Sequence, residues 1–419
     1  MTEPATGDVT IRRATKADAP AVGDVWLASW RATFDFAPGH PDDAVRTWLA
    51  QELIPSTEAW VALDPAGRVV GLMALSAAMV EQLYLAPDWI GRGLGARLLD
   101  VAKAQRPGGL DLYCFQVNDR ARRFYERHGF AAIAFGDGSG NEEHQPDIRY
   151  AWRPMAVVHS VDGTPIARFD EGEGPPLVLV HGAAADHTTF RVVGPRLASR
   201  CTVHAIDRRG RGASGDTLPY AIEREVEDVA AVAEALANET GRQVAVFGHS
   251  WGGRCALGAA LRTSAIERVI SYEGAPPPGS MRYQEPDLVD RLAALDAAGR
   301  PDELLATFLR EVVGMTPDEL TRYQAEPVWP RRVEAAPTIV RELRAETDPG
   351  AGLEVLGAVR QPVLQLLGGE SRPVFGEATR ALDRRLADGR IVTIPGAKHA
   401  AHHTHPDAVI EAVTTFLGV

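Results

Sequence analysis

The sequence predicts two domains that both combine helices and strands: a mixed α+β domain over residues 1–154, and a doubly wound, mostly parallel α/β sheet over residues 155–419. The length of 419 residues exceeds the roughly 100–200 residues of a common single domain. After residue 157, apolar strand-like runs alternate with helical segments, which is the pattern of a parallel sheet. The two parts share no internal repeat and carry different motifs.

The composition limits the class of partner. A net charge of −12 and a pI near 5.5 argue against binding to a nucleic-acid backbone, which requires clustered Lys and Arg. The three cysteines are far apart and form neither a disulfide framework nor a CxxC metal motif. Residues 1–8 do not resemble a signal peptide, and no run of about 18 apolar residues predicts a membrane span. We therefore expect a cytoplasmic protein that acts on small molecules, without nucleic-acid or membrane partners.

Strand-like and helix-like segments alternate through the first domain. Short runs rich in apolar and β-branched residues predict strands, and longer segments with helical periodicity lie between them. The predicted strands are residues 9–12, 59–63, 69–75, 80–85, 110–117 and 131–135. The predicted helices are residues 18–30, the end of a glycine-containing stretch at 91–104, and 119–128. Residues 136–147 are rich in Gly and charge, and they predict a loop.

The second domain is predicted to open with a β-hairpin around Asp162-Gly163, a pair that suits a turn with positive φ. Further strands are expected at residues 177–180, 201–206, 244–247, 268–273, 363–367 and 390–394. Between residues 275 and 358 the pattern becomes helical, with helices expected near residues 289–297 and 302–312. We expect this helical insertion to form a lid over a site at the strand ends.

A candidate nucleophile lies between a strand and a helix. The segment Gly248-His-Ser-Trp-Gly252 has the G-x-S-x-G pattern of a nucleophile elbow, in which small flanking residues allow a tight turn and the serine projects above the sheet. Ser250 is therefore the predicted nucleophile. The backbone amide of Trp251, at the helix start, would face a developing oxyanion. A second amide donor is expected from Ala183, in the loop that follows the strand at residues 177–180.

The candidate general base is His399, which follows a predicted strand near the C-terminus. Elbow-type hydrolases order their triad as serine, acid and histidine along the chain, which places the base late in the sequence. Three further histidines are close by: His402, His403 and His405. Such spacing on one helix face is compatible with a metal site, but no acidic or cysteine ligand accompanies it, and a solvated helix is the preferred interpretation.

Two carboxylates compete for the role of the acid that orients the histidine. The segment Gly369-Glu-Ser-Arg-Pro373 has Arg372 where an aspartate is usual before the proline, and Glu370 is displaced from that position. Glu273 ends the strand that follows the nucleophile helix, one strand earlier. Glu273 is preferred and Glu370 stays open, because the acid needs only to reach the imidazole and hold its tautomer.

These motifs together resemble the α/β-hydrolase superfamily over about residues 157–419. The resemblance rests on His181-Gly182, the segment Asp207-Arg-Arg-Gly-Arg-Gly-Ala-Ser214, the elbow, and Gly396-Ala-Lys-His399. It implies acyl transfer from an ester or related acyl compound to water, with Ser250 as nucleophile and no cofactor. The Arg-rich loop is compatible with an anion site, but in this superfamily it is usually structural.

A glycine loop marks the first domain. Ile90-Gly-Arg-Gly-Leu-Gly-Ala96 lies between a predicted strand and a predicted helix. The first turn of a helix presents free N–H groups and a positive dipole end, which suit a pyrophosphate. The spacing matches neither the dinucleotide fingerprint nor a Walker loop, so the loop alone is equally compatible with a tight turn.

With Tyr84-Leu-Ala-Pro87 before this loop and Asn118 to Phe130 after it, residues 9–153 resemble the GNAT N-acetyltransferases. The resemblance implies that acetyl-CoA binds through residues Leu85, Arg92, Gly93, Leu94, Gly95, Ala96 and Asn118. It also implies that Tyr125 protonates the departing thiolate and that Glu81 is a candidate base for the amine. Other interpretations stay open: Asn118 caps its helix, Tyr125 is a core residue, and Glu81 is an exposed strand residue.

We therefore expect a bifunctional enzyme, an acetyl-CoA-dependent N-acetyltransferase joined to a serine hydrolase of small-molecule esters. The sequence is also compatible with two alternatives. In one, only the hydrolase is catalytic and the N-terminal domain binds CoA or serves as a scaffold. In the other, the C-terminal domain is an acyltransferase or perhydrolase, because the same triad can transfer an acyl group to an acceptor other than water.

Overall fold

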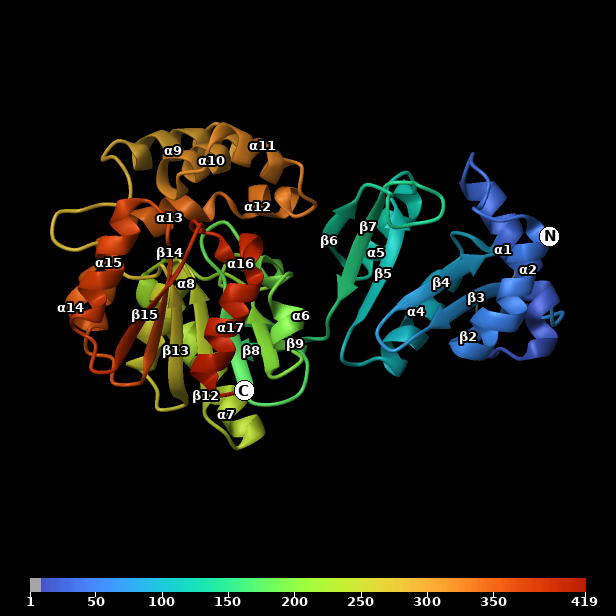
Figure 1. The fold of residues 1–419 in the computed structure, drawn as a ribbon, viewed down its shortest axis with the longest axis horizontal. Coiled ribbons are helices and arrows are strands. Elements are labelled where there is room, and N and C mark those ends of the chain that lie inside the picture. Colours follow the sequence, from blue (N-terminus) through green and yellow to red (C-terminus); the bar gives the residue numbers. More distant parts are fainter. Residues whose placement is uncertain (1–8) are drawn as a thin grey trace. The chain divides into compact units, whose positions relative to one another are not determined.

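The computed structural model describes residues 9–419 and divides into two compact units, the first ending at Pro154 and the second spanning Met155–Val419 (Figure 1). The expectation that no signal peptide is present concerns residues 1–8, which lie outside the described residues. None of the helices within residues 9–419 is both long and apolar enough to cross a membrane.

Two separate sheets form the first unit. Four antiparallel strands lie in the order β1 (Thr10–Arg13), β2 (Glu58–Leu63), β3 (Val69–Leu75) and β4 (Val80–Leu85). A second antiparallel sheet has the order β5 (Leu110–Phe115), β7 (Asp147–Trp152) and β6 (Ala131–Gly136). Strands β4 and β5 run parallel and meet at an isolated bridge between Met79 and Asp111. Beyond this bridge the described residues of the two strands form no ladder, so the sheets separate and leave a wedge between them.

Helices cover both faces of these sheets. One core joins strands β2 and β3 to α1 (Ala19–Thr33), α2 (Asp42–Trp48), the π-helical turn Leu49–Leu53 and α3 (Ile54–Ser56). A second core joins both sheets to α4 (Leu94–Gln105) and α5 (Asp119–Arg127). Helix α2 and strand β7 were not predicted from the sequence. The segment of α2 is charged and is half-exposed, so its helix depends on packing against α1, and β7 is fixed by partners 30 or more residues earlier on β5.

The second unit contains one eight-stranded sheet. Its order is β15 (Gly389–Ile394), β14 (Val363–Gly368), β13 (Ile266–Tyr272), β12 (Val244–His249), β10 (Pro176–Val180), β11 (Thr202–Ile206), β9 (Pro165–Glu171) and β8 (Met155–His159). Strand β9 is antiparallel to both β8 and β11, and the six strands β10–β15 are parallel to one another. The predicted doubly wound, mostly parallel sheet is therefore confirmed.

Each central strand is buried on both faces and contributes alternate residues to two cores. Val178 and Val246 face one core, which holds α7 (Ile222–Thr240), α8 (Trp251–Ala260), α14 (Leu353–Leu356) and α15 (Pro373–Asp383). Leu179 and Phe247 face the other, which holds α6 (Gly194–Leu197), α16 (Ala401–Thr404) and α17 (Pro406–Leu417). This period-2 burial on both faces explains why the strands appear in the sequence as continuous apolar runs.

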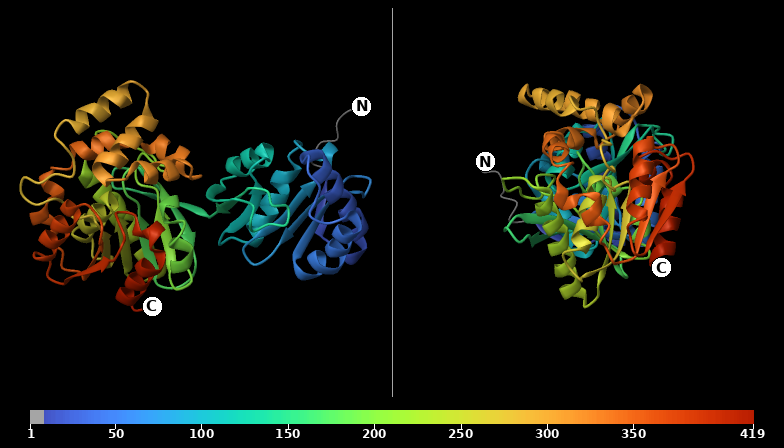
Figure 2. Two further views of the ribbon diagram at one scale, coloured as in Figure 1. Left: turned by 45° about the horizontal axis from the view of Figure 1, so that its top comes forward. Right: turned by 90° about the vertical axis from the view of Figure 1, so that its left-hand side faces the viewer.

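A helical lid lies above the carboxyl ends of the parallel strands (Figure 2). It consists of α9 (Leu288–Ala297), α10 (Pro301–Phe308), the π-helical turn Leu309–Val313, α11 (Pro317–Gln324), α12 (Trp329–Ala335) and α13 (Thr338–Arg344). These helices share an apolar core of their own, to which Leu304 and Ile339 belong and which also includes Ala184 of the sheet domain. The predicted lid is present, within the region expected from the sequence.

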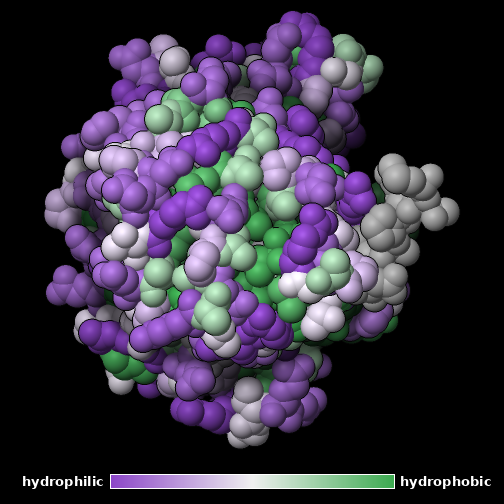
Figure 3. Space-filling model, turned by 90° about the vertical axis from the view of Figure 1, so that its right-hand side faces the viewer, coloured by the Kyte–Doolittle hydropathy of each residue, from purple (hydrophilic) through white to green (hydrophobic). Residues whose placement is uncertain are grey.

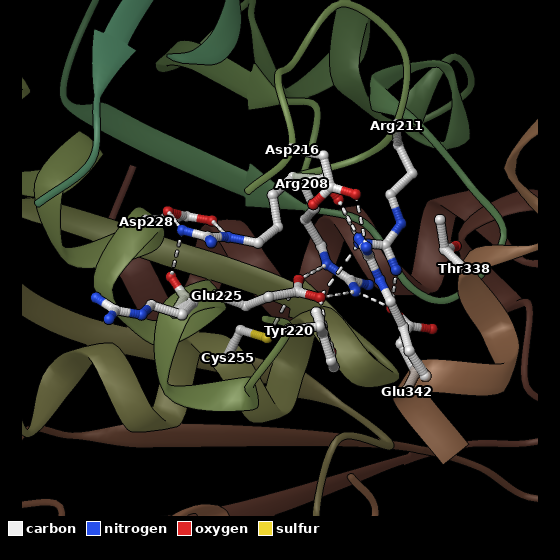
Figure 4. A network of polar contacts seen from close by, with 12 residues as sticks. Arg208, Arg211, Asp216, Tyr220, Glu225, Asp228, Cys255, Thr338 and Glu342 are labelled. Atoms are coloured by element: carbon white, nitrogen blue, oxygen red, sulfur yellow. Dashed lines mark hydrogen bonds and ion pairs between the residues drawn. The ribbon is translucent and has the colours of Figure 1, made fainter. Parts of the chain in front are cut away.

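Buried ion pairs fasten the lid to the sheet domain (Figure 4). Arg208 donates two hydrogen bonds to the Glu225 carboxylate on α7, at 2.6 and 3.0 Å, and also binds Glu342 on lid helix α13. Arg211 binds the same two carboxylates. Burial alone would raise the pKa of Glu225, but the guanidinium groups of Arg208 and Arg211 lower it below its usual range. The Arg-rich loop is thus satisfied by internal carboxylates, as its structural interpretation requires.

Replacing Glu225 with Gln should destabilise the second unit, because the change leaves two buried guanidinium groups with less compensating charge. Removal of one partner from a buried pair costs roughly 3–5 kcal/mol. Urea unfolding followed by circular dichroism measures the loss in the free energy of unfolding. Glu303→Gln is the matched control, since Glu303 pairs with Arg300 at the surface and such pairs contribute about 0–1 kcal/mol. Equal effects of the two substitutions would contradict this account of the lid anchor.

Candidate active sites

The nucleophile elbow is built by glycines that permit close backbone contact. Ser250 lies between β12 and α8 with φ +53°, a left-handed conformation that is costly for a residue with a side chain. A Cβ atom on Gly248 would lie 2.2 Å from the carbonyl oxygen of Gly252, and one on Gly252 would lie 2.3 Å from that of Val180. The glycine pattern is therefore a steric requirement of the turn that presents Ser250.

The two expected oxyanion donors are free. Within residues 9–419, the backbone amides of Ala183 and Trp251 donate no hydrogen bond. The loop of Ala183 lies against the nucleophile, since a Cβ atom on Gly182 would lie 3.1 Å from Ser250 Cβ. Two unpaired amides near one serine Oγ are the arrangement that stabilises a tetrahedral oxyanion.

His181 holds this loop in place. Its Nε2 accepts a hydrogen bond from the Arg208 amide at 3.0 Å, so its Nδ1–H donates to the carbonyl oxygen of Gly182 at 2.8 Å. Burial, followed by the charge of Arg208, lowers the pKa of His181 to about 3. The imidazole therefore stays neutral and keeps one tautomer across the working pH range.

The imidazole of His399 is oriented by Glu273. Its Nδ1 lies 2.5 Å from Glu273 Oε2, and both side chains are at least 93% buried. The other carboxylate oxygen accepts a hydrogen bond from the Gly368 amide at 2.8 Å. Glu273 has φ +49°, so its strained turn directs the carboxylate toward the histidine.

Glu370, the competing acid, does not reach the imidazole. It is exposed, and its carboxylate makes no hydrogen bond or ion pair within the described part of the chain. Its backbone amide instead donates to the carbonyl oxygen of Ala397, which fixes the turn after β14. The geometry therefore brings Glu273, and not Glu370, to His399.

The neighbouring histidines form a buried cluster rather than a solvated helix face. His402 is 2% exposed and its ring lies 4.4 Å from that of His249, so the expectation of a solvated helix is wrong at this position. Burial, reinforced by other nearby histidines, lowers the pKa of His249 and His402 well below the usual range. The neutral His249 ring donates from Nε2 to the carbonyl oxygen of His399 at 2.8 Å. This hydrogen bond supports the backbone of His399.

Ser250, Glu273 and His399 line one cavity of about 50 Å³ beneath the lid. The apolar side chains of the lid helices, including Phe308 and Leu343, form part of its wall. Phe375 stacks on His399 with ring centroids 4.4 Å apart. The sequence carries no local signal for Phe375, because only the packing of α15 against the sheet brings it to the imidazole.

The glycine loop of the first unit presents a set of unpaired amides. Gly91 and Gly93 have φ +86° and +84°, and Gly93 caps α4. Within the described residues, the amides of Gly93, Leu94, Gly95 and Ala96 donate no hydrogen bond. A Cβ atom on Gly95 would lie 3.3 Å from the Phe124 ring, so this glycine lets α4 approach α5. Such a helix start suits a phosphate group.

Other residues predicted for cofactor binding surround this loop. Leu85 ends β4 with its side chain 3.6 Å from the Cβ position of Gly95, and Arg92 lies over the Trp89 ring. Asn118 caps α5, because its side-chain oxygen accepts from the Ala121 amide at 3.1 Å, and it also lines the cavity of this unit.

Arg120 was not singled out from the sequence. Its guanidinium Nη2 lies 3.0 Å from the Cβ position of Gly91, although the two residues are 29 positions apart. This side chain adds a positive charge beside the unpaired amides. Only the packing of the start of α5 against the loop reveals it.

Tyr125 and Glu81 meet at one cavity of about 1310 Å³ in the first unit. Tyr125 is 8% exposed, and burial raises the pKa of its phenol well above the usual range, which keeps the phenol protonated. Glu81 lies exposed on β4, on the wall of the same cavity. The structure therefore brings the proposed acid and base to one space beside the wedge between β4 and β5.

Comparison with known proteins identifies two families. A model of the Alpha/beta hydrolase family matches residues 177–412, and a model of the Acetyltransferase (GNAT) domain matches residues 55–132. The chain is 27% identical over 258 residues to the "2-(acetamidomethylene)succinate hydrolase" of Mesorhizobium japonicum, which covers 59% of this chain and 90% of that protein. It is 29% identical over 259 residues to a pimeloyl-acyl-carrier-protein methyl ester esterase of Xanthomonas campestris, covering 59% of this chain and 96% of that protein.

Solved structures show the same architecture. The crystal structure of an alpha/beta hydrolase from Sphaerobacter thermophilus matches with a TM-score of 0.54 and 34% identity, covering 62% of this chain and 100% of that one. A hydrolase from Pseudomonas aeruginosa matches with a TM-score of 0.53 and 26% identity. The elbow, the sheet order and the family match agree, and the chain belongs to the alpha/beta hydrolase family, with a GNAT acetyltransferase domain preceding the hydrolase domain.

Proposed function

We propose that residues 155–419 hydrolyse an ester or amide bond of a small acyl compound through Ser250, His399 and Glu273. The observation that carries the proposal is the 2.5 Å contact of His399 Nδ1 with Glu273, in a cavity that also holds the strained Ser250. A buried carboxylate on Nδ1 fixes the tautomer whose Nε2 accepts a proton, and it stabilises the imidazolium that forms.

The proposed reaction has two stages. Ser250 Oγ attacks the carbonyl carbon and its proton passes to His399 Nε2, while the amides of Ala183 and Trp251 bind the oxyanion. The bond to the leaving group breaks as His399 returns the proton to it, and an acyl-enzyme remains. A water molecule then attacks the acyl carbon while His399 Nε2 takes its proton, and the bond to Ser250 Oγ breaks as His399 returns that proton to the serine, which releases the acid.

A short acyl group is the proposed substrate feature. The cavity of about 50 Å³ beside Ser250 is enclosed on one side by Phe308 and Val312 of the lid. The names of two relatives support cleavage of an amide or an ester: one relative is a hydrolase of an acetamido compound, and the other is a methyl ester esterase. We extend only the bond type, ester or amide, to this chain.

The N-terminal domain is proposed to transfer an acetyl group from acetyl-CoA to an amine. The unpaired amides at the start of α4 suit the pyrophosphate, and Arg120 adds charge beside them. Glu81 would take the proton of the amine, directly or through water, and Tyr125 would protonate the thiolate. The support is that both side chains line one cavity next to the split between β4 and β5.

Ser250→Ala should abolish cleavage of short p-nitrophenyl esters, with kcat lowered by roughly 10⁴–10⁶-fold. Glu273→Gln should lower kcat by roughly 10⁴-fold, because the neutral amide no longer holds the imidazole in the required tautomer. Glu370→Gln is the matched control and should retain activity within about twofold, since its exposed carboxylate makes no hydrogen bond or ion pair in the described chain.

Steady-state kinetics and labelling with a fluorophosphonate probe test this assignment together. Retention of activity by Glu273→Gln with its loss in Glu370→Gln would reverse the assignment of the acid. Failure of the wild type to react with any ester, amide or probe would contradict the hydrolase proposal. Preferred formation of a transesterified product in the presence of alcohols would indicate an acyltransferase instead.

Tyr125→Phe should lower kcat for acetyl transfer by roughly 10²–10⁴-fold, because the substitution removes only the proton donor. The phenol OH makes no hydrogen bond within residues 9–419, so the melting temperature should hardly change. Release of the CoA thiol, measured with a disulfide reagent, follows turnover, and calorimetry follows acetyl-CoA binding. If the wild type binds acetyl-CoA but acetylates no amine, the N-terminal domain would be a CoA-binding module and not a second enzyme.

A further inference from the structure

The cavity of the acetyltransferase domain has a lining rich in aromatic and acidic residues. It lies among α1, α2, β4, β5 and the segment from Gly136 to Glu143, and its volume is about 1310 Å³. A polar contact joins two of the lining segments: His40 Nε2 lies 3.0 Å from a Glu142 carboxylate oxygen. The Gly39 amide also donates to Glu143 at 3.3 Å. A face of this unit is shown in Figure 3, with hydrophobic surface framed by hydrophilic side chains.

Aromatic rings form one wall of this cavity. Trp26 and Trp30 stack on α1 with ring centroids 4.9 Å apart, and Tyr84 of β4 lies 5.1 Å from Trp26. Phe115 of β5 meets Trp30 edge to face at 6.0 Å. Trp26 and Trp30 are only 6% and 3% exposed, so they form a rigid apolar wall against which an apolar ring can pack.

The lining also contains seven carboxylates. The acidic lining residues are Asp43, Glu52, Glu81, Asp137, Glu142, Glu143 and Asp147. Among the described lining residues there is no Lys or Arg, and His40 is already paired with Glu142. Asp43, Glu52 and Glu81 lie exposed, and their carboxylates have no cationic partner within residues 9–419. An anionic ligand would be repelled by this field, whereas a cation would be concentrated in it.

We propose that the acetyl acceptor is an arylalkyl amine that enters as a cation and carries no carboxylate. The inference rests on the acetyltransferase activity proposed above and adds the class of acceptor. The aromatic wall receives the ring of the acceptor, and the carboxylates attract its ammonium group. An amino acid with the same ring brings a carboxylate into a site that already holds seven, without an arginine to receive it.

The proposed transfer is balanced without another reactant. The ammonium group loses one proton to solvent through Glu81. The neutral nitrogen then forms the N–C bond to the acetyl carbon as the C–S bond breaks, and the sulfur takes the proton of Tyr125. The surplus proton of the nitrogen returns through water to the Tyr125 phenolate, and the products are an N-acetyl amine and the CoA thiol.

Matched acceptor pairs test the proposal on the full chain. Tryptamine is compared with tryptophan, and 2-phenylethylamine with phenylalanine, by release of the CoA thiol from acetyl-CoA. We expect kcat/KM for each amine to exceed that of its amino acid by at least about tenfold, with a decline at high salt that reflects screening. Equal rates for the two members of each pair, or a preference for the amino acids, would overturn the proposal.

Two variants test whether the preference for amines arises from the carboxylates of the cavity. Asp43→Asn combined with Glu52→Gln should raise KM for tryptamine at least about threefold with little change in kcat, because both carboxylates attract the cation without touching the reacting atoms. Asp100→Asn removes an exposed charge on α4, outside the cavity, and should leave KM unchanged. An equal shift in both variants would assign the effect to net charge and overturn the role of the cavity.

Binding of unreactive probes separates this inference from the proposed activity. Calorimetry should detect binding of phenyltrimethylammonium in the presence of CoA and much weaker binding of 3-phenylpropionate. Selective binding of the cation without any acetyl transfer would support the cavity's charge preference and overturn the proposed enzyme activity. Acetyl transfer together with equal or preferred binding of 3-phenylpropionate would overturn the inference and leave the activity standing.

Discussion

Contact between two strained turns is the constraint on which the hydrolase site depends. Ser250 and Glu273 both have left-handed backbones, at φ +53° and +49°. Their turns meet through Gly253 and Gly274, since a Cβ atom on Gly274 would lie 2.6 Å from Gly253 Cα. The Ser250 amide also donates to the carbonyl oxygen of Tyr272 at 2.7 Å. The same packing therefore positions Ser250 at the end of β12 and Glu273 at the end of the adjacent strand β13, and each strained turn is held by its contact with the other.

Arg208 extends this constraint to the oxyanion loop and the lid. Its amide holds the neutral His181, which in turn fixes the carbonyl of Gly182, and its guanidinium joins Glu225 of α7 to Glu342 of lid α13. Desolvation of these charges is offset only because every guanidinium faces a carboxylate. The loop that carries Ala183 and lid helix α13 are thus both attached to Arg208, so their positions are linked through this one residue.

The acetyltransferase domain places its chemistry around a break in its own sheet. Strands β4 and β5 separate after the bridge between Met79 and Asp111, so the facing edges of the two strands form no ladder with each other. The free amides at the start of α4 lie near Leu85, at the end of β4, while Glu81 lies at its beginning. In the proposed acetyl transfer, phosphate recognition and proton uptake by Glu81 thus lie at opposite ends of one strand, a separation that would suit a long thioester substrate.

Sequence alone determined the domain order, the parallel sheet, the lid region and the two motifs, because each depends on local periodicity or on glycine positions within one turn. Ser250, His399 and the glycine loop are recognisable for that reason. The choice between Glu273 and Glu370 needed the tertiary structure, since both follow strands and only the left-handed turn at Glu273 directs a carboxylate to His399. The same holds for Arg120, Phe375 and the acidic, aromatic cavity, whose side chains are distant in sequence and are brought together only by packing.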